Sequence, residues 1–320
     1  MAKDSKKAKL QQQQPQTKNN NNKGKLIWVI FVGIVLGYVG YLVVNKKNQQ
    51  NIIQEQKVTN GKYGEKVVNN YKILERYNRQ PNQYTQCFMF YNSTHILETS
   101  GLYEISSAHF LKYDRDQNSI SEPIGVFNFS QQFNNKIFAE GCTLYNNQVY
   151  ILTYKEDHML VFDNELKIVI KKVNYPSFIK EGWGLTHYKD SLIVTDGSDK
   201  IYFFDENLVL KNSLQVKGCS NSNFCTYFNE LEIYKGYLLA NQYYSTILFV
   251  INMNTGQVEK EYNMLFLAQE VIQTTNDPQY FNKGFVFNGI AYDESTDTLL
   301  VTGKFWPFIY KIQLIDFPNK

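Results

Sequence analysis

The sequence has little of the material from which metal sites, thiol-based active sites and nucleic-acid interfaces are made. Its 320 residues include four cysteines and four histidines, with no C-x-x-C pair and no histidine spacing typical of zinc. Residues 1–47 hold nine of the 33 basic side chains and one of the 30 acidic ones, so the rest of the chain is mildly acidic. We therefore expect no nucleic-acid partner, because phosphate contacts need a positive face.

What the sequence does contain is apolar and aromatic side chains. Hydrophobic residues make up 43% of the chain and aromatic residues 15%, mostly as 24 Tyr and 22 Phe. This is enough to bury the core of one large domain or two ordinary ones. Because aromatic residues favour pleated sheet, the composition predicts an all-β body, and it excludes collagen, coiled coil and a wholly disordered chain.

The N-terminal region is typical of a membrane anchor. Residues 1–25 are rich in Lys, Gln and Asn and predict a disordered basic tail. Residues 26–44 form an uncharged run of 19, about 28 Å long as a helix, which is close to the hydrocarbon thickness of a bilayer. The excess of Lys before the run predicts a cytoplasmic tail and a lumenal or extracellular body, as in a single-pass type II protein. The alternative is a cleaved signal peptide, whose apolar stretch is usually shorter and ends at a small-residue cleavage site.

Two features agree with a body in an oxidising compartment. Asn92 and Asn128 begin N-x-S/T sequons and are candidate glycosylation sites. Cys219 and Cys225 lie six residues apart in a polar stretch, where we expect a small disulfide. The other two cysteines, Cys87 and Cys142, stand in apolar strand patterns, and we interpret them as small packing residues.

The body contains a fivefold repeat in which a Gly- or Asn-marked turn precedes two short strands. The second strand of each unit ends in Thr or Asn, and these residues align the units: Thr99, Thr153, Thr195, Asn241 and Thr302. The spacings of 42 to 61 residues indicate the blades of a five-bladed β-propeller over residues 81–320, preceded by a linker and lead-in strand over 45–80. A β-sandwich is the alternative fold, but it does not explain so long a repeat. Residues 263–275 have an apolar stripe and predict a short helix between the last two units.

Polar residues recur at or near the repeat turns. Because equivalent positions in a propeller converge, these residues are expected to be neighbours although they are distant in sequence: Glu140, Trp183, Asn229, Asn288 and Lys304. The set contains a carboxylate, amides, a cation and an indole. It contains no nucleophile paired with a base.

Seven stretches between residues 84 and 314 resemble the motifs of the plant-type, metal-independent glutaminyl-peptide cyclotransferases, the glutamine cyclotransferase family. They are YTQC (84–87), ETSGLYEISS (98–107), FAEGCTL (138–144), EGWGL (181–185), NELE (229–232), FNGIAYD (287–293) and VTGKFWP (301–307). The corresponding family motifs include F-T-Q-G, F-G-E-G-L-T-L and D-G-W-G-L. The resemblance implies a five-bladed propeller that cyclises N-terminal glutamine to pyroglutamate.

The resemblance also implies roles for individual residues. Glu140 occupies the family's general acid/base position, Lys304 and Asn229 match its candidates for stabilising the oxyanion, and Gln86 matches a residue of the substrate wall. Trp183 offers an indole N–H. This chain has Tyr84 where the family has Phe, Tyr154 and Tyr243 where it commonly has Trp, and Cys87 where it has Gly.

The chemistry implied is an intramolecular acyl transfer. The α-amine of the terminal glutamine attacks its own side-chain carbonyl carbon, and one carboxyl group takes a proton from the amine and gives one to the departing ammonia. The expected substrates are peptides or proteins with N-terminal glutamine, and no metal or other cofactor is required. The alternative function is a non-catalytic propeller that binds peptides or glycans.

Overall fold

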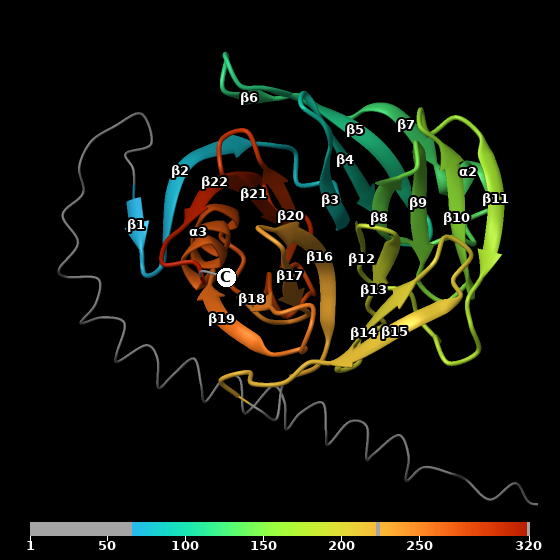
Figure 1. Cartoon of the computed structure of the whole chain (residues 1–320). Helices are drawn as coiled ribbons and strands as arrows, with labels where there is room; N and C mark the ends of the chain where they lie inside the picture. Colours follow the sequence, from blue (N-terminus) through green and yellow to red (C-terminus); the bar gives the residue numbers. More distant parts are fainter. Residues whose placement is uncertain (1–65, 222–224, 319–320) are drawn as a thin grey trace, which may run out of the picture. The chain divides into compact units, whose positions relative to one another are not determined.

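The computed structural model describes residues 66–221 and 225–318, all within one compact unit of the chain (Figure 1). The tail, anchor and most of the linker that we expect over residues 1–65 lie outside the described residues. Within the described part of the chain, no helix is both long and apolar enough to span a membrane.

Five antiparallel sheets make up this unit, and each is one blade of a propeller (Figure 1). Blade 1 contains β3 (Thr85–Asn92), β4 (His95–Ser100), β5 (Ser107–Asp114), β6 (Ser119–Ile120) and β7 (Ile124–Asn128). Blade 2 contains β8 (Ala139–Tyr145), β9 (Gln148–Thr153), β10 (His158–Asp163) and β11 (Val169–Asn174). The short helix α2 (Phe129–Gln132) connects these two blades.

The next two blades repeat the same four-stranded pattern. Blade 3 contains β12 (Leu185–Tyr188), β13 (Ser191–Val194), β14 (Lys200–Phe204) and β15 (Leu210–Gln215). Blade 4 contains β16 (Phe228–Tyr234), β17 (Tyr237–Gln242), β18 (Ile247–Ile251) and β19 (Val258–Asn263). The helix α3 (Leu265–Thr275) follows blade 4 and confirms the helix predicted over residues 263–275.

Blade 5 joins the two ends of the described chain. Its strands β20 (Phe287–Asp293), β21 (Thr298–Gly303) and β22 (Phe308–Leu314) come last in the sequence, and the sheet continues with β2 (Tyr71–Asn78) and β1 (Lys66–Val68). The lead-in strand that we expected before residue 81 is therefore an outer strand of the last blade. Pairing of β2 with β22 closes the ring.

The five innermost strands contact one another in the order β3, β8, β12, β16, β20 and back to β3. Five apolar clusters fill the five spaces between successive blades. Between blades 5 and 1, for example, Phe88 and Ile96 pack with Leu300 and Ile309. One sheet alone could not bury both its faces, so packing around the ring supplies the core. This arrangement confirms the propeller and excludes the sandwich.

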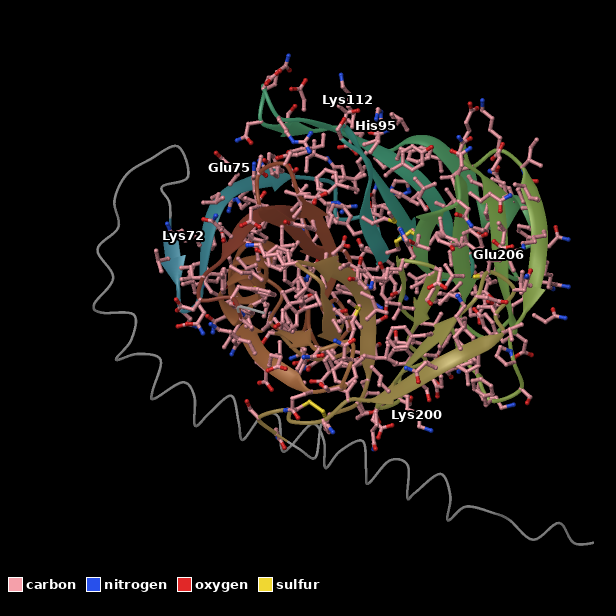
Figure 2. The ribbon with its side chains drawn as sticks, viewed as in Figure 1. Lys72, Glu75, His95, Lys112, Lys200 and Glu206 are labelled. Carbon is pink, nitrogen blue, oxygen red and sulfur yellow. A yellow bond between two sulfur atoms is a disulfide. The ribbon has the colours of Figure 1, made fainter. Side chains whose placement is uncertain are left out.

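The cysteines form two disulfides, both visible in Figure 2. The predicted pair, Cys219 and Cys225, is confirmed. Our interpretation of Cys87 and Cys142 as separate packing residues was wrong: they are bonded to each other, with Cα atoms 5.5 Å apart. Cys87 lies on β3 and Cys142 on β8, so this disulfide joins blades 1 and 2. The two strands become neighbours only when blades 1 and 2 pack together, which is why spacing in the sequence did not indicate the pair.

Candidate active site

Most of the candidate residues lie near the start of the innermost strands, four of which carry a β-bulge, while Lys304, Tyr154 and Tyr243 directly follow the second strands β21, β9 and β17. In each case one extra residue interrupts the pairing with the second strand: between Thr85 and Cys87, Ala139 and Cys142, Phe228 and Leu231, and Phe287 and Ile290. The interrupted stretches contain Gln86, Glu140, Asn229 and Asn288. A bulge turns side chains out of the regular alternation of a strand and is common beside active sites. The repeat positions that we took for turns are therefore mostly bulges.

The Thr and Asn residues that align the repeats are all fully buried, and three of the five hold a bulge in place. The hydroxyl of Thr99 donates to the backbone oxygen of Glu140 at 2.6 Å, and that of Thr195 donates to the backbone oxygen of Asn229 at 2.8 Å. The amide of Asn241 donates to the side-chain oxygen of Asn288 at 3.0 Å. Each of these three residues thus fixes the bulge of the next blade. Thr153 and Thr302 bond within their own blades instead.

Gly184 shows how closely neighbouring inner strands approach. A Cβ atom at this position would lie 1.8 Å from the backbone oxygen of Asn229. Any side chain at position 184 would therefore displace the strand that carries Asn229, which explains why glycine follows Trp183.

Glu140 is the central ionisable group of the site. It is only 4% exposed, and its Oε1 accepts a hydrogen bond of 3.0 Å from Nε2 of Gln86. Burial raises the pKa of the carboxyl well above its usual range. The positive charge of Lys304 opposes this rise in pKa, while the negative charges of Glu156 and Glu181 add to it. The neutral form is therefore much easier to reach than for a carboxyl group in water.

Lys304 is the cation of the site and is 2% exposed. Its Nζ lies 4.5 Å from the centre of the Tyr84 ring and 5.0 Å from that of Tyr243, so two aromatic faces partly replace its water shell. Burial lowers the pKa of the ammonium to about 8, and the charges of Glu140 and Glu230 oppose that change. Lys304 and Glu140 thus share one buried region, as we expected.

Two amide oxygens in the site have no hydrogen-bond partner within the described part of the chain. They are Oε1 of Gln86, whose Nε2 is bonded to Glu140, and Oδ1 of Asn229. A buried polar atom without a partner costs free energy. Both atoms are acceptors, so a ligand that supplies N–H groups would satisfy them.

Aromatic rings form the walls around these groups. Tyr84 and Tyr154 each pack against Phe138, and Tyr243 meets Trp183 edge to face. Burial raises the pKa of Tyr84 to about 12, so its hydroxyl stays protonated at neutral pH. The indole N–H of Trp183 donates to Oε2 of Glu181 at 3.1 Å. The indole N–H that we expected Trp183 to offer is thus hydrogen-bonded to Glu181 in this structure.

Sequence reasoning gave no role to Glu230 and left that of Asn288 open. Glu230 accepts a hydrogen bond of 2.6 Å from the backbone N–H of Phe88, and burial raises its pKa well above the usual range. Asn288 donates to the backbone oxygens of Thr85 at 2.9 Å and Gln86 at 3.2 Å, so it fixes the strand that carries Gln86. The NELE motif contains Glu230, but nothing in it showed that this side chain reaches across to blade 1.

The arrangement suits proton transfer beside a developing negative charge. It provides a carboxyl group with a raised pKa, a buried ammonium, an amide and aromatic walls. Among the described residues, no group of three or more His, Cys, Asp or Glu side chains could hold a metal ion.

The fold and the site define a five-bladed β-propeller with a buried acid and amide on its inner strands and a buried lysine in the turn after β21. A family model for glutamine cyclotransferases matches residues 44–314, and the chain therefore belongs to this enzyme family. The glutaminyl-peptide cyclotransferase of Arabidopsis thaliana is 24% identical over 248 residues, which are 77% of this chain and 72% of the relative. The crystal structure of Myxococcus xanthus glutaminyl cyclase has a similar fold, with a TM-score of 0.64, 24% identity, and coverage of 77% of this chain and 96% of that one.

Proposed function

We propose that this protein converts the N-terminal glutamine of peptides or proteins to pyroglutamate and releases ammonia. The observation that carries the proposal is the environment of Glu140, a buried carboxyl group with a raised pKa that is bonded to the amide of Gln86 and lies in the field of a buried lysine. Membership of the glutamine cyclotransferase family supports the same reaction.

The first step is proton transfer from the substrate. A peptide α-amine has a pKa of about 7.7–8.0 and is mostly protonated at neutral pH, so it must lose a proton before it can attack. Ionised Glu140 takes that proton. Because burial raises the pKa of Glu140, the transfer costs less free energy than transfer to an ordinary carboxylate would. The unpaired oxygens of Gln86 and Asn229 accept the N–H groups of the bound glutamine.

The second step forms the ring. The amine nitrogen bonds to the side-chain carbonyl carbon, whose oxygen becomes negatively charged. The ammonium of Lys304 and the amide N–H of Asn229 stabilise this charge, and they are most effective where water is excluded. The aromatic walls hold the side chain folded back on its own amine, which is the arrangement that an intramolecular reaction needs.

The third step releases ammonia. The bond between the carbonyl carbon and the amide nitrogen breaks, and Glu140 returns its proton to the departing nitrogen. The restored carboxylate then takes the extra proton that remains on the ring nitrogen and passes it to the ammonia, so the products are neutral pyroglutamyl peptide and ammonium. Every step uses protein groups, so we propose that no metal or other cofactor is required.

The direct test uses the purified full-length chain in detergent, a peptide that begins with glutamine, and a metal chelator. We expect ammonia release in proportion to pyroglutamate, with loss of turnover in Glu140→Gln and retention in Glu206→Gln, an exposed control in the turn between β14 and β15 (Figure 2). Binding of the peptide without ammonia release would instead favour a non-catalytic propeller.

We also propose that the catalytic unit faces the secretory lumen or the cell exterior, anchored by residues 26–44. Two disulfides in the described structure support an oxidising compartment. Asn92, the last residue of β3, is exposed, whereas Asn128 is half-buried at the start of α2, where its side chain accepts a hydrogen bond from the backbone N–H of Gln131. Deglycosylation of cell-derived protein should shift its mobility in gels, and Asn92→Gln should remove most of that shift.

A further inference from the structure

The Cys87–Cys142 disulfide lies directly beside the candidate catalytic pair. Cys87 follows Gln86, and Cys142 comes two residues after Glu140. Both cysteines are almost fully buried, at 2% and 1% exposure. Their strands, β3 and β8, belong to different sheets, so no ladder of backbone hydrogen bonds joins them.

Together with nearby hydrogen bonds, the disulfide anchors the chain on both sides of the two bulges that carry Gln86 and Glu140. Ahead of Glu140, the backbone N–H of Ala139 donates to the hydroxyl of Ser106 at 2.8 Å. Beyond Glu140, Cys142 is bonded to Cys87. The bulge that carries the carboxyl group is thus attached to blade 1 at both ends.

Gln86 is held in the same way. The backbone oxygen of Thr85, just before it, accepts a hydrogen bond of 2.9 Å from Asn288, and Cys87 just after it carries the disulfide. Of the five spaces between blades in the described structure, the one between blades 1 and 2 is crossed both by the Gln86–Glu140 hydrogen bond and by a covalent link.

We infer that the Cys87–Cys142 disulfide is a positioning device, which sets the separation of β3 and β8 so that Nε2 of Gln86 remains bonded to Oε1 of Glu140. The inference rests on the proposed cyclisation, in which Glu140 carries the proton. The bond from Gln86 stabilises the ionised form of Glu140, which must accept the proton of the amine. A wider separation of the strands would weaken that bond, leave a smaller ionised fraction and slow proton transfer.

The test is a double-mutant cycle in the full-length chain. It compares wild type, Cys87→Ala/Cys142→Ala, Gln86→Met, and the triple variant, each shown to be folded by its thermal transition. Loss of the disulfide should lower kcat about tenfold when Gln86 is present and less than twofold in the Gln86→Met background. A purely structural disulfide would give equal losses in both backgrounds, and that result would overturn the inference.

Cys219→Ala/Cys225→Ala is the matched control and should keep kcat within twofold of wild type. If the Cys87→Ala/Cys142→Ala variant does not fold, reduction of folded Cys219→Ala/Cys225→Ala protein by dithiothreitol, followed by thiol counting, opens the remaining disulfide without refolding. The same kcat comparison, with and without Gln86→Met, then applies.

A second measurement does not depend on turnover. The infrared carbonyl band of Glu140, taken as the difference between each protein and its Glu140→Gln counterpart, reports its protonation against pH. Loss of the disulfide should raise the pKa of Glu140 by at least half a unit when Gln86 is present, and an unchanged pKa would overturn the inference. If wild type releases no ammonia but loss of the disulfide still raises the pKa of Glu140, the proposed reaction is wrong. The inference that the disulfide maintains the Gln86–Glu140 hydrogen bond would still hold.

Discussion

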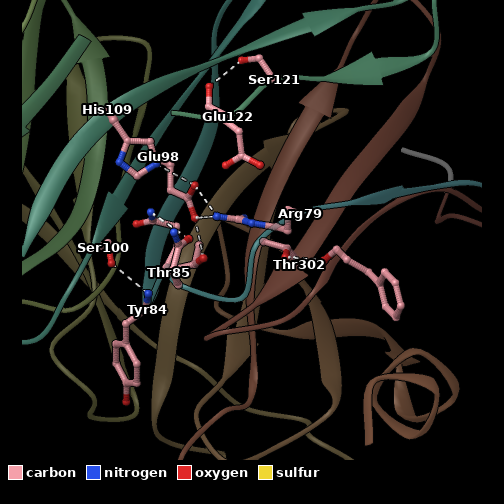
Figure 3. Close-up of polar contacts among 12 residues, drawn as sticks. Arg79, Tyr84, Thr85, Glu98, Ser100, His109, Ser121, Glu122 and Thr302 are labelled. Carbon is pink, nitrogen blue, oxygen red and sulfur yellow. Dashed lines mark hydrogen bonds and ion pairs between the residues drawn. The ribbon is translucent and has the colours of Figure 1, made fainter. Parts of the chain in front are cut away.

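Glu98 and Glu140 are buried carboxyl groups in neighbouring blades, but their surroundings are opposite in kind. Arg79 donates to both oxygens of Glu98, at 3.0 and 2.9 Å, Thr85 donates at 2.6 Å, and His109 at 3.0 Å (Figure 3). Burial alone would raise the pKa of Glu98, but these partners outweigh burial and lower it to about 2.

Glu140 has one side-chain donor, the neutral amide of Gln86, and two of the charges around it are negative. Burial therefore dominates, and its pKa rises. The comparison shows that burial by itself does not make a carboxyl group reactive. The number and charge of its partners decide whether it stays ionised or exchanges protons near neutral pH.

Replacing each of these glutamates by glutamine should separate catalysis from stability. In Glu140→Gln we expect kcat to fall by about 10²–10⁴, because general acid–base catalysis is lost. The free energy of unfolding should change by less than about 1 kcal/mol, since the amide keeps the bond to Gln86 and adds no charge. Ammonia release and urea unfolding measure the two quantities. Activity within tenfold of wild type would show that Glu140 does not carry the proton.

Glu98→Gln should have the reverse effect. It leaves Arg79 buried without its anion, and removing one partner of a buried ion pair costs about 3–5 kcal/mol of unfolding free energy. The kcat of the protein that remains folded should stay within a few-fold of wild type. Adding Arg79→Met should recover part of the lost stability, because neither charge then remains. A loss below about 1 kcal/mol in Glu98→Gln would mean that the cluster contributes little.

The two carboxyl groups should also give opposite dependences of stability on pH. Glu98 has a folded pKa of about 2 against a usual value of 4.5, so its contribution, about 3 kcal/mol, is complete above pH 4.5 and is lost as pH falls towards 2. Glu140 has a raised folded pKa, so its neutral form favours folding at low pH and that advantage declines as pH rises above 4.5. Urea unfolding of wild type, Glu98→Gln and Glu140→Gln from pH 2 to above pH 4.5 measures how each carboxyl group changes the free energy of unfolding with pH. If both groups changed it in the same direction, the difference between Glu98 and Glu140 would be contradicted.

The sequence allowed much of this architecture to be predicted because each blade repeats the same local pattern. Three of the five residues that aligned the repeats, Thr99, Thr195 and Asn241, hold the bulge of the next blade. Glu140 and Lys304 were found through motifs and do come together in one buried region.

Contacts between blades were harder to predict because they join residues with no local signature. The Cys87–Cys142 bond depends on packing between blades 1 and 2, and the contact of Glu230 with Phe88 and the entry of β2 into the last blade depend on ring closure. Glu98 belongs to a motif that we quoted, but its partner Arg79 comes from the segment between β2 and β3, outside every motif. The motifs thus predicted which side chains belong to the site, but not which residues contact them.

The smallest expected effect comes from altering one charge near Glu140 while Glu140 itself is left intact. Glu181 raises the pKa of Glu140 through its negative charge and accepts the indole N–H of Trp183. Glu181→Gln removes the charge but keeps an acceptor for Trp183, and the ion pair lost with exposed Lys155 is worth little. We expect the acid limb of the pH profile of kcat/KM to move down by less than one pH unit, with the maximal rate within twofold of wild type. Glu206→Gln should leave the limb in place. An upward shift in Glu181→Gln would mean that nearby negative charge does not hold Glu140 in its protonated form, and the contrast with Glu98 would then rest on hydrogen-bond donors alone.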